Sequence, residues 1–152
     1  MIYIVFYIVI LLFTGCTKNL SSSDQIESFG SENSLDIITW NIENFPKDSE
    51  TIDYVSELIV NLNVDIITLQ EITNQNSFND LVNQLGGGWI GYRSDNSNYQ
   101  ELSYLINLDH VEITQSPYTI LDNYEHYFAY RAPYLVEVSF NEETFIIINV
   151  HY

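Results

Sequence analysis

The sequence predicts an α/β or α+β domain in which a mixed β-sheet is covered by helices. Apolar residues make up 46% of the 152 residues, too many for an intrinsically disordered chain and enough for one buried core. Short β-rich runs alternate with apolar residues at helical spacing between residues 35 and 85. From residue 89 onward the pattern consists mainly of strands, and this order favours a mixed sheet with helices packed on it.

The first 16 residues are typical of an export signal. Residues 1–13 are all apolar or aromatic, and this run is too short to span a bilayer but suits the core of a secretion signal. Thr14 and Gly15 then precede Cys16, the only cysteine, which resembles a bacterial lipobox. Cleavage there would leave Cys16 at the N-terminus, where it is lipidated. A signal anchor with an incidental cysteine is the alternative.

A polar segment separates this signal from the folded body. Residues 17–34 are rich in Ser, Asn and acidic side chains, which predicts a flexible tether. The folded body is expected over residues 35–152. We therefore expect an exported protein that Cys16 anchors by its lipid to a bacterial membrane, at the outer membrane or the cell surface.

The first half of the body is predicted to alternate strands and helices. A buried strand over residues 35–40 is followed by Pro46, and Asp48 or Ser49 is suited to cap a helix over residues 50–61. A second strand is expected over 64–69. The spacing of Phe78, Leu81, Val82 and Leu85 indicates a second helix, which three glycines end at 86–88.

The second half is predicted to consist of strands. The expected segments are residues 101–106, 111–115, 133–140 and 144–150. Residues 141–143, Asn-Glu-Glu, are typical of a hairpin turn between the last two.

Charge and cysteine content exclude several kinds of site. The chain has 4 Lys and Arg against 21 Asp and Glu, a formal net charge of −17, which argues against a basic groove for nucleic acid. A single cysteine excludes a disulfide framework and a four-cysteine zinc site. Phosphate chemistry would therefore take its positive charge from a metal ion.

Three predicted strands are followed by polar side chains suited to catalysis. Asn41 follows the first strand, Glu71 the second, and His151 the last. Ligand sites in α/β sheets favour the carboxyl ends of strands, and a carboxylate beside an apolar strand is costly unless it is paired or binds a cation. Without cysteine ligands, the expected ion is Mg²⁺, or Ca²⁺ or Mn²⁺. Taken singly, Asn41 fits a turn, Glu71 a helix cap and His151 an ordinary histidine, so only their combination indicates a site.

Five segments in one order resemble the endonuclease/exonuclease/phosphatase superfamily, and most closely its deoxyribonuclease branch. The segments are Trp40-Asn41-Ile42, residues 65–71 (Asp-Ile-Ile-Thr-Leu-Gln-Glu), residues 99–104 (Tyr-Gln-Glu-Leu-Ser-Tyr), Arg131-Ala132-Pro133 and Asn149-Val150-His151. The similarity runs from residue 35 to residue 152. It implies a four-layer α/β/β/α sandwich, of which this chain would form the N-terminal half.

The resemblance also implies roles for individual residues. Glu71 would be the metal ligand, and Asn41 would support the metal and the phosphate. Arg131 would contact a substrate phosphate, although pairing with a carboxylate is an alternative for it. Tyr99 would lie along the substrate strand.

The remaining two roles concern proton transfer. His151 would bind the scissile phosphate or assist proton transfer, and Glu101 would orient its ring, because a carboxylate on one ring nitrogen fixes the tautomer. The implied reaction is metal-assisted hydrolysis of a phosphoester. The substrate stays open between DNA, RNA, a phospholipid head group and a sugar or inositol phosphate.

The sequence departs from the family beyond His151. Family members continue with an Asp-x-Asn segment, a further Asp and a late Asp-His pair, and none of these is found here at a suitable position. We therefore expect the 152 residues to be inactive without a C-terminal half of the domain. The alternative is a non-catalytic surface lipoprotein that uses the same framework to bind a partner.

Overall fold

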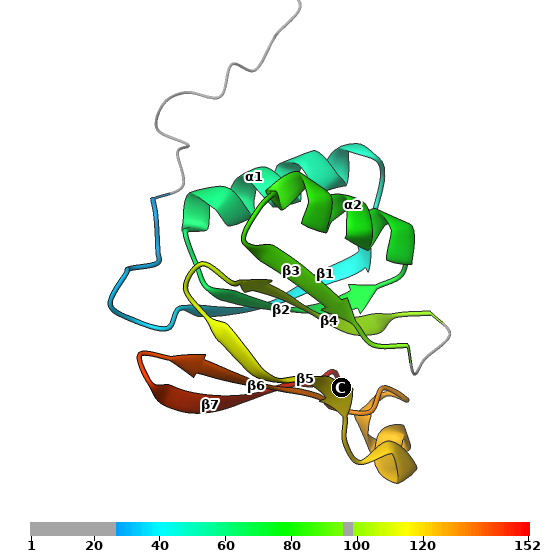
Figure 1. The fold of residues 1–152 in the computed structure, drawn as a ribbon. Coiled ribbons are helices and arrows are strands. Elements are labelled where there is room, and N and C mark those ends of the chain that lie inside the picture. Colours follow the sequence, from blue (N-terminus) through cyan, green and yellow to red (C-terminus); the bar gives the residue numbers. More distant parts are fainter. Residues whose placement is uncertain (1–26, 96–98) are drawn as a thin grey trace, which may run out of the picture.

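A computed structural model describes residues 27–95 and 99–152 in three layers (Figure 1). Two helices cover one face of a four-stranded sheet, and a three-stranded sheet packs against its other face. The predicted α/β class with a mixed sheet is confirmed. The predicted signal, Cys16 and most of the predicted tether lie outside the described residues.

The four-stranded sheet has the order β1-β2-β4-β3. Its strands are β1 (Ile37–Phe45), β2 (Ile66–Ile72), β3 (Trp89–Arg93) and β4 (Glu101–Asn107). β1 and β2 are parallel, whereas β4 runs antiparallel to both β2 and β3. The carboxyl ends of β1 and β2 and the amino end of β4 therefore meet at one edge of the sheet.

The two helices begin and end close to where the sequence predicts. α1 spans Glu50–Leu62 and α2 spans Gln75–Leu85. Of the two predicted capping residues, Asp48 accepts a hydrogen bond from the Thr51 N–H at 3.0 Å, whereas the Ser49 side chain makes no capping bond.

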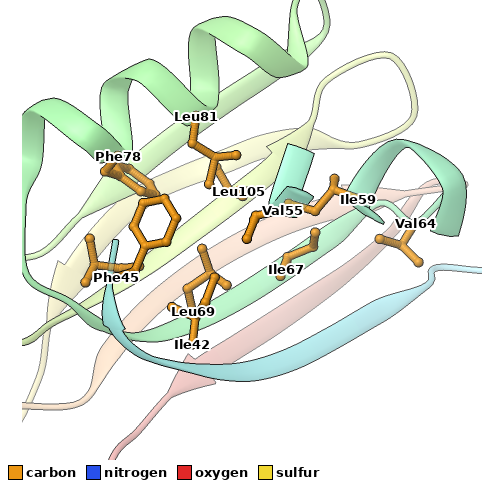
Figure 2. Close-up of a cluster of buried hydrophobic side chains, with 11 residues drawn as sticks. Ile42, Phe45, Val55, Ile59, Val64, Ile67, Leu69, Phe78, Leu81 and Leu105 are labelled. Carbon is orange, nitrogen blue, oxygen red and sulfur yellow. The ribbon is translucent and has the colours of Figure 1, made fainter. Parts of the chain in front are cut away.

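The main core lies between the helices and the four-stranded sheet (Figure 2). It contains Ile42, Phe45, Val55, Ile59, Val64, Ile67, Leu69, Ile72, Phe78, Leu81 and Leu105. α2 approaches β3 so closely that a Cβ added to Gly91 would lie 2.4 Å from Val82 Cγ2 and 2.9 Å from Phe78 Cε1. Only glycine therefore fits at position 91 without displacing the Val82 and Phe78 side chains of α2.

The second sheet is a meander of β5 (Glu112–Thr119), β6 (Tyr134–Phe140) and β7 (Glu143–Asn149). Its inner face forms a second core against the first sheet, made of Ile66, Leu102, Tyr104, Ile106, Val111, Tyr134, Val136 and Val138. Its outer face carries Ile146 and Ile148 of β7, which are 62% and 49% exposed.

Two elements were not predicted. β3 carries a polar residue and a glycine in the run Trp-Ile-Gly-Tyr-Arg, all half-buried, so neither a clean alternation nor an apolar run marks it. The 3₁₀ helix η1 (Asp122–Phe128) lies between β5 and β6 and is rich in polar and aromatic residues. Among the described residues, no helix has the length and apolar character needed to cross a membrane.

Candidate active site

Glu71 stands on a bulge near the end of β2. The pairing of β2 with both neighbouring strands shifts register here: Gln70 pairs with Asn41 of β1, but Ile72 pairs with Phe45. Glu71 has a φ of +66°, a left-handed conformation that is uncommon for a residue with a side chain. Such bulges redirect side chains, and this one presents the Glu71 carboxylate at the edge of the sheet.

Four donors surround the Glu71 carboxylate. The Asn41 Nδ2 lies 3.1 Å and the His151 Nε2 lies 3.2 Å from its Oε1. The Asn44 backbone N–H lies 3.2 Å and the Gln100 Nε2 lies 2.9 Å from its Oε2. The predicted group of Asn41, Glu71 and His151 is therefore brought together, although His151 lies just after β7 of the second sheet.

These contacts keep Glu71 ionised. Burial acts to raise the pKa of its carboxyl, but hydrogen bonds from the Asn41 amide, the Asn44 N–H and the His151 ring act to lower it. The net result is a pKa below the usual value for glutamate. The side chain is only 13% exposed, so a charged carboxylate is held at the edge of the protein interior.

Arg131 and Glu71 bind opposite nitrogens of the His151 ring. Arg131 Nη1 lies 3.1 Å from His151 Nδ1. A guanidinium only donates, so Nδ1 accepts and the ring proton of the neutral tautomer lies on Nε2, which donates to Glu71. The structure therefore orients His151 between a cation and a carboxylate.

Two buried residues fix the end of β7 that carries His151. The Asn149 side chain donates to the backbone oxygens of Leu69 and Ser103, at 2.9 and 3.1 Å, and accepts from Gln70 Nε2 at 2.7 Å. These bonds join β7 to the four-stranded sheet. They explain how a histidine of one sheet reaches a carboxylate of the other.

Gln100 is a site residue that sequence analysis missed. Its Nε2 donates to Glu71 and, at 2.6 Å, to Asn44 Oδ1, while its side-chain oxygen accepts from Arg131 Nη2. Its backbone oxygen accepts from Arg131 Nε at 2.5 Å. Gln100 therefore links the carboxylate to the guanidinium. Its place directly before Glu101 was the only available signal, since a glutamine alone indicates no chemistry.

Glu101 and Tyr99 lie beside this group in different settings. Glu101 is fully buried and accepts a 2.5 Å hydrogen bond from the Ser94 hydroxyl, whereas the contacts of the His151 ring nitrogens are with Arg131, Asn41 and Glu71. The orienting role predicted for Glu101 stays a prediction. Tyr99 is 63% exposed, and its predicted place along a substrate strand also stays a prediction.

The oxygen ligands that Glu71 and Asn41 offer agree with a hard divalent ion held by few protein groups. Within residues 27–95 and 99–152, no group of three or more His, Cys, Asp and Glu side chains forms a metal cluster. Mg²⁺ often binds through one or two carboxylates and keeps several waters, so the one ionised carboxylate of Glu71 fits it chemically. Glu71 would supply that ligand, with the Asn41 amide beside it.

A depression elsewhere on the surface contains no predicted site residue. It has a volume of about 560 Å³ and lies between β3 and the start of β5, where Ile90, Tyr92, His110 and Ile113 are among its lining residues. The candidate site is instead a polar cluster at the ends of strands from both sheets.

Comparison with known proteins decides the family. The sequence profile of the endonuclease/exonuclease/phosphatase family matches residues 38–140, more than half of the chain. The chain belongs to this family. No curated protein sequence matches the chain. Solved structures are similar over 77% of it: a humanized D. rerio TDP2 with 14 mutations (TM-score 0.65, 15% identity), D. rerio TDP2 with a single-strand DNA product (0.63, 13%) and ANGEL2, a 2′,3′-cyclic phosphatase (0.57, 9%).

The same comparisons define how much of the family fold is present. The chain spans 49%, 45% and 40% of these three proteins, so it corresponds to about half of their length. At such low identity the likeness shows the fold alone. It agrees with the predicted half of a sandwich, with helices on one face of a pair of stacked sheets. That this half is the N-terminal one stays a prediction.

Proposed function

We propose that this chain forms the metal-binding and phosphate-contacting half of an exported, lipid-anchored phosphoesterase that hydrolyses phosphodiester bonds. The observation that carries the proposal is the convergence of four hydrogen-bond donors on the Glu71 carboxylate at the edge where both sheets meet. A bound Mg²⁺, Ca²⁺ or Mn²⁺ would polarise the phosphoryl group and stabilise the leaving oxygen.

The chain's own residues would bind and orient the phosphate. Arg131, which already donates to Gln100 and His151, is the cation of the site and is suited to a phosphate oxygen. His151 carries a proton on Nε2 in the assigned tautomer, so it is suited to donate to a phosphate oxygen. Asn41 would support both the metal and the phosphate.

Nucleic acid is the substrate class that the comparisons favour, with other phosphoesters kept open. D. rerio TDP2 has been solved with a single-strand DNA product, and its fold is similar to this one. The net charge of −17 opposes tight binding of long duplex DNA. This balance favours a nuclease-like activity on short or unpaired strands.

The 152 residues are proposed to need a further half-domain for activity. No cluster of three or more metal-ligating side chains is found among the described residues, and one carboxylate is a sparse site for phosphoryl chemistry. We expect purified 152-residue protein to leave bis(p-nitrophenyl) phosphate intact in Mg²⁺. Turnover clearly above the metal-only rate would overturn this part of the proposal.

The site itself is tested by calorimetric titration with Mg²⁺. We expect one site that Glu71→Gln abolishes and Glu57→Gln, which removes a charge from the exposed face of α1, leaves intact. Equal binding by both variants would mean that Mg²⁺ responds to the general negative charge. That result would favour the second candidate, a non-catalytic surface lipoprotein that uses the same framework to bind a partner.

Anchoring at Cys16 is tested separately in a bacterial host. We expect radiolabelled palmitate to be incorporated into the full-length chain and lost with Cys16→Ser. Export with no label in either protein would show a signal anchor instead.

A further inference from the structure

Three polar residues of the site each have an exposed tyrosine as a chain neighbour. The pairs are Tyr99 with Gln100, Tyr130 with Arg131, and Tyr152 with His151, and the tyrosines are 63%, 68% and 81% exposed. Adjacent Cα atoms are 3.8 Å apart, so the backbone of each of these tyrosines lies directly beside a residue that contacts Glu71, Arg131 or His151. We call Tyr99, Tyr130 and Tyr152 the tyrosine rim.

The backbone before Arg131 holds Tyr130 in a defined place. Ala129 and Tyr130 both have left-handed conformations, with φ of +52° and +60°. The Tyr130 N–H donates to Glu125 O at 2.9 Å, and the Arg131 N–H donates to Phe128 O at 3.0 Å. Strained residues persist where the surrounding structure determines them, so the backbone from which the Tyr130 ring projects is fixed.

The 3₁₀ helix η1 extends this aromatic surface. Tyr124 and Tyr127 are 56% and 68% exposed. The ring of Phe128 packs against that of Tyr152, with centroids 5.8 Å apart, which joins η1 to the end of the chain beside His151. In Figure 1, η1 and the C-terminus lie at the same end of the three-stranded sheet.

Positive charge cannot supply the affinity for a polyanion here. Between residues 27 and 152, apart from the three not described, the Lys and Arg side chains are Lys47, Arg93 and Arg131. Lys47 pairs with Glu43 at 3.0 Å, and Arg93 donates to the backbone oxygen of Ile72 at 3.1 Å. Only Arg131 lies in the site. A ligand held there needs another source of binding energy, and exposed rings provide it by stacking.

We propose that the tyrosine rim stacks on the unpaired bases of a single-stranded nucleic acid whose phosphate lies at Arg131 and His151. This inference rests on the proposed function and narrows its substrate. Paired bases inside a duplex present no free face to a ring, so a stacking rim selects single strands. Stacking is also tolerant of base identity, since every base has an aromatic face.

Fluorescence anisotropy with a labelled ten-nucleotide single strand tests the proposal, in EDTA so that binding is separated from metal. We expect Tyr130→Leu to weaken binding about tenfold, because one stacked base is worth on the order of this factor. Tyr130→Phe keeps the ring and should stay within about twofold. Tyr54→Leu is the matched control, since Tyr54 is 66% exposed on α1, away from the site.

Three comparisons with the wild-type protein complete the test. The wild-type protein should bind an abasic strand of equal length about as weakly as the Tyr130→Leu variant binds the normal strand. It should also bind a duplex more weakly than a single strand. With one phosphate contact, the logarithm of affinity should fall against the logarithm of salt with a slope of about −0.7. Equal affinity for duplex and single strand, a slope steeper than about −3, or no loss in Tyr130→Leu would overturn the proposal.

Failure of the tyrosine rim and failure of the phosphoesterase proposal give different results. If Mg²⁺ does not bind at Glu71 but Tyr130→Leu still weakens strand binding, only the phosphoesterase proposal fails. If Mg²⁺ binds at Glu71 but single strands do not bind, the tyrosine rim fails. Loss of binding to phosphatidylglycerol vesicles in Tyr130→Leu, with strand binding unchanged, would point to a membrane surface and also overturn it.

Discussion

Tyr104 supports the connection between the two sheets on which the site depends. Tyr134 of β6 and Asn149 of β7 are paired in register, and the Tyr104 hydroxyl of β4 stands between them. It accepts from the Asn149 N–H at 3.1 Å, and its single proton is shared between Tyr134 O and Ile147 O, at 2.5 and 3.0 Å. Tyr104→Phe removes this hydroxyl and keeps the ring. The variant therefore isolates the contribution of the hydroxyl's hydrogen bonds, which join β4 to β6 and β7.

The expected cost follows from the groups left without partners. Asn149 is 2% exposed, so its N–H would be buried without an acceptor, at a cost of about 1–3 kcal/mol. Losing the bonds to the carbonyls adds about 1 kcal/mol. We therefore expect the free energy of unfolding to fall by about 2–4 kcal/mol, a large part of the stability of a small domain.

Urea unfolding followed by circular dichroism measures this difference. With a urea slope of about 2 kcal/mol/M, in the middle of the range for small proteins, the midpoint of Tyr104→Phe should fall by about 1–2 M. Tyr54→Phe removes a hydroxyl from the exposed face of α1 and should leave the midpoint unchanged. The reasoning is refuted if the two variants have the same midpoint, because the hydroxyl would then contribute nothing to joining the sheets.

Three further predictions concern the site and the core. Gln100→Ala should weaken Mg²⁺ binding by at least about tenfold in a calorimetric titration, because second-layer hydrogen bonds orient metal ligands. Gln84→Ala, which removes a comparable 2.9 Å bond to a carboxylate on α1, should not, and equal losses would contradict the role of Gln100. Gly91→Ala should lower the unfolding free energy by about 1–3 kcal/mol in urea, since its Cβ would meet Val82; an unchanged midpoint would show that α2 yields freely. The lowered pKa of Glu71 adds stability above the unfolded-state pKa that is lost as pH falls through the folded-state pKa. The difference in unfolding free energy between wild type and Glu71→Gln should therefore shift steadily against the wild type below about pH 5, and a pH-independent difference would contradict it.

Most of the fold could be predicted from the sequence, because buried helices and strands have clear hydrophobic patterns. Both helices were predicted from apolar spacing, and β2, β4, β6 and β7 from apolar β-rich runs. β1 extends five residues past its predicted end, since the bulge opposite Glu71 lets the chain continue through polar residues to Phe45. β3 and η1 could not be predicted because they are half-buried or exposed. Neither therefore has a strong hydrophobic periodicity in its sequence.

The site was predictable only where chemistry-bearing side chains follow strands. Asn41, Glu71 and His151 were each ambiguous alone, and their order along the chain gave the signal. Which nitrogen of His151 faces which partner depends on contacts between the two sheets, and these are set by Asn149 and not by local sequence. Gln100 could not be predicted from the sequence either, because its role consists of hydrogen bonds to residues that are distant along the chain.

The central claim is that a divalent ion binds at the Glu71 carboxylate. Paramagnetic Mn²⁺, added in substoichiometric amounts to ¹⁵N-labelled protein, tests it by broadening amide resonances near the ion. The account predicts selective loss of the signals of Asn44, Gln100 and His151, and their return in Glu71→Gln. Broadening spread over the acidic surface, or unchanged by Glu71→Gln, would contradict it.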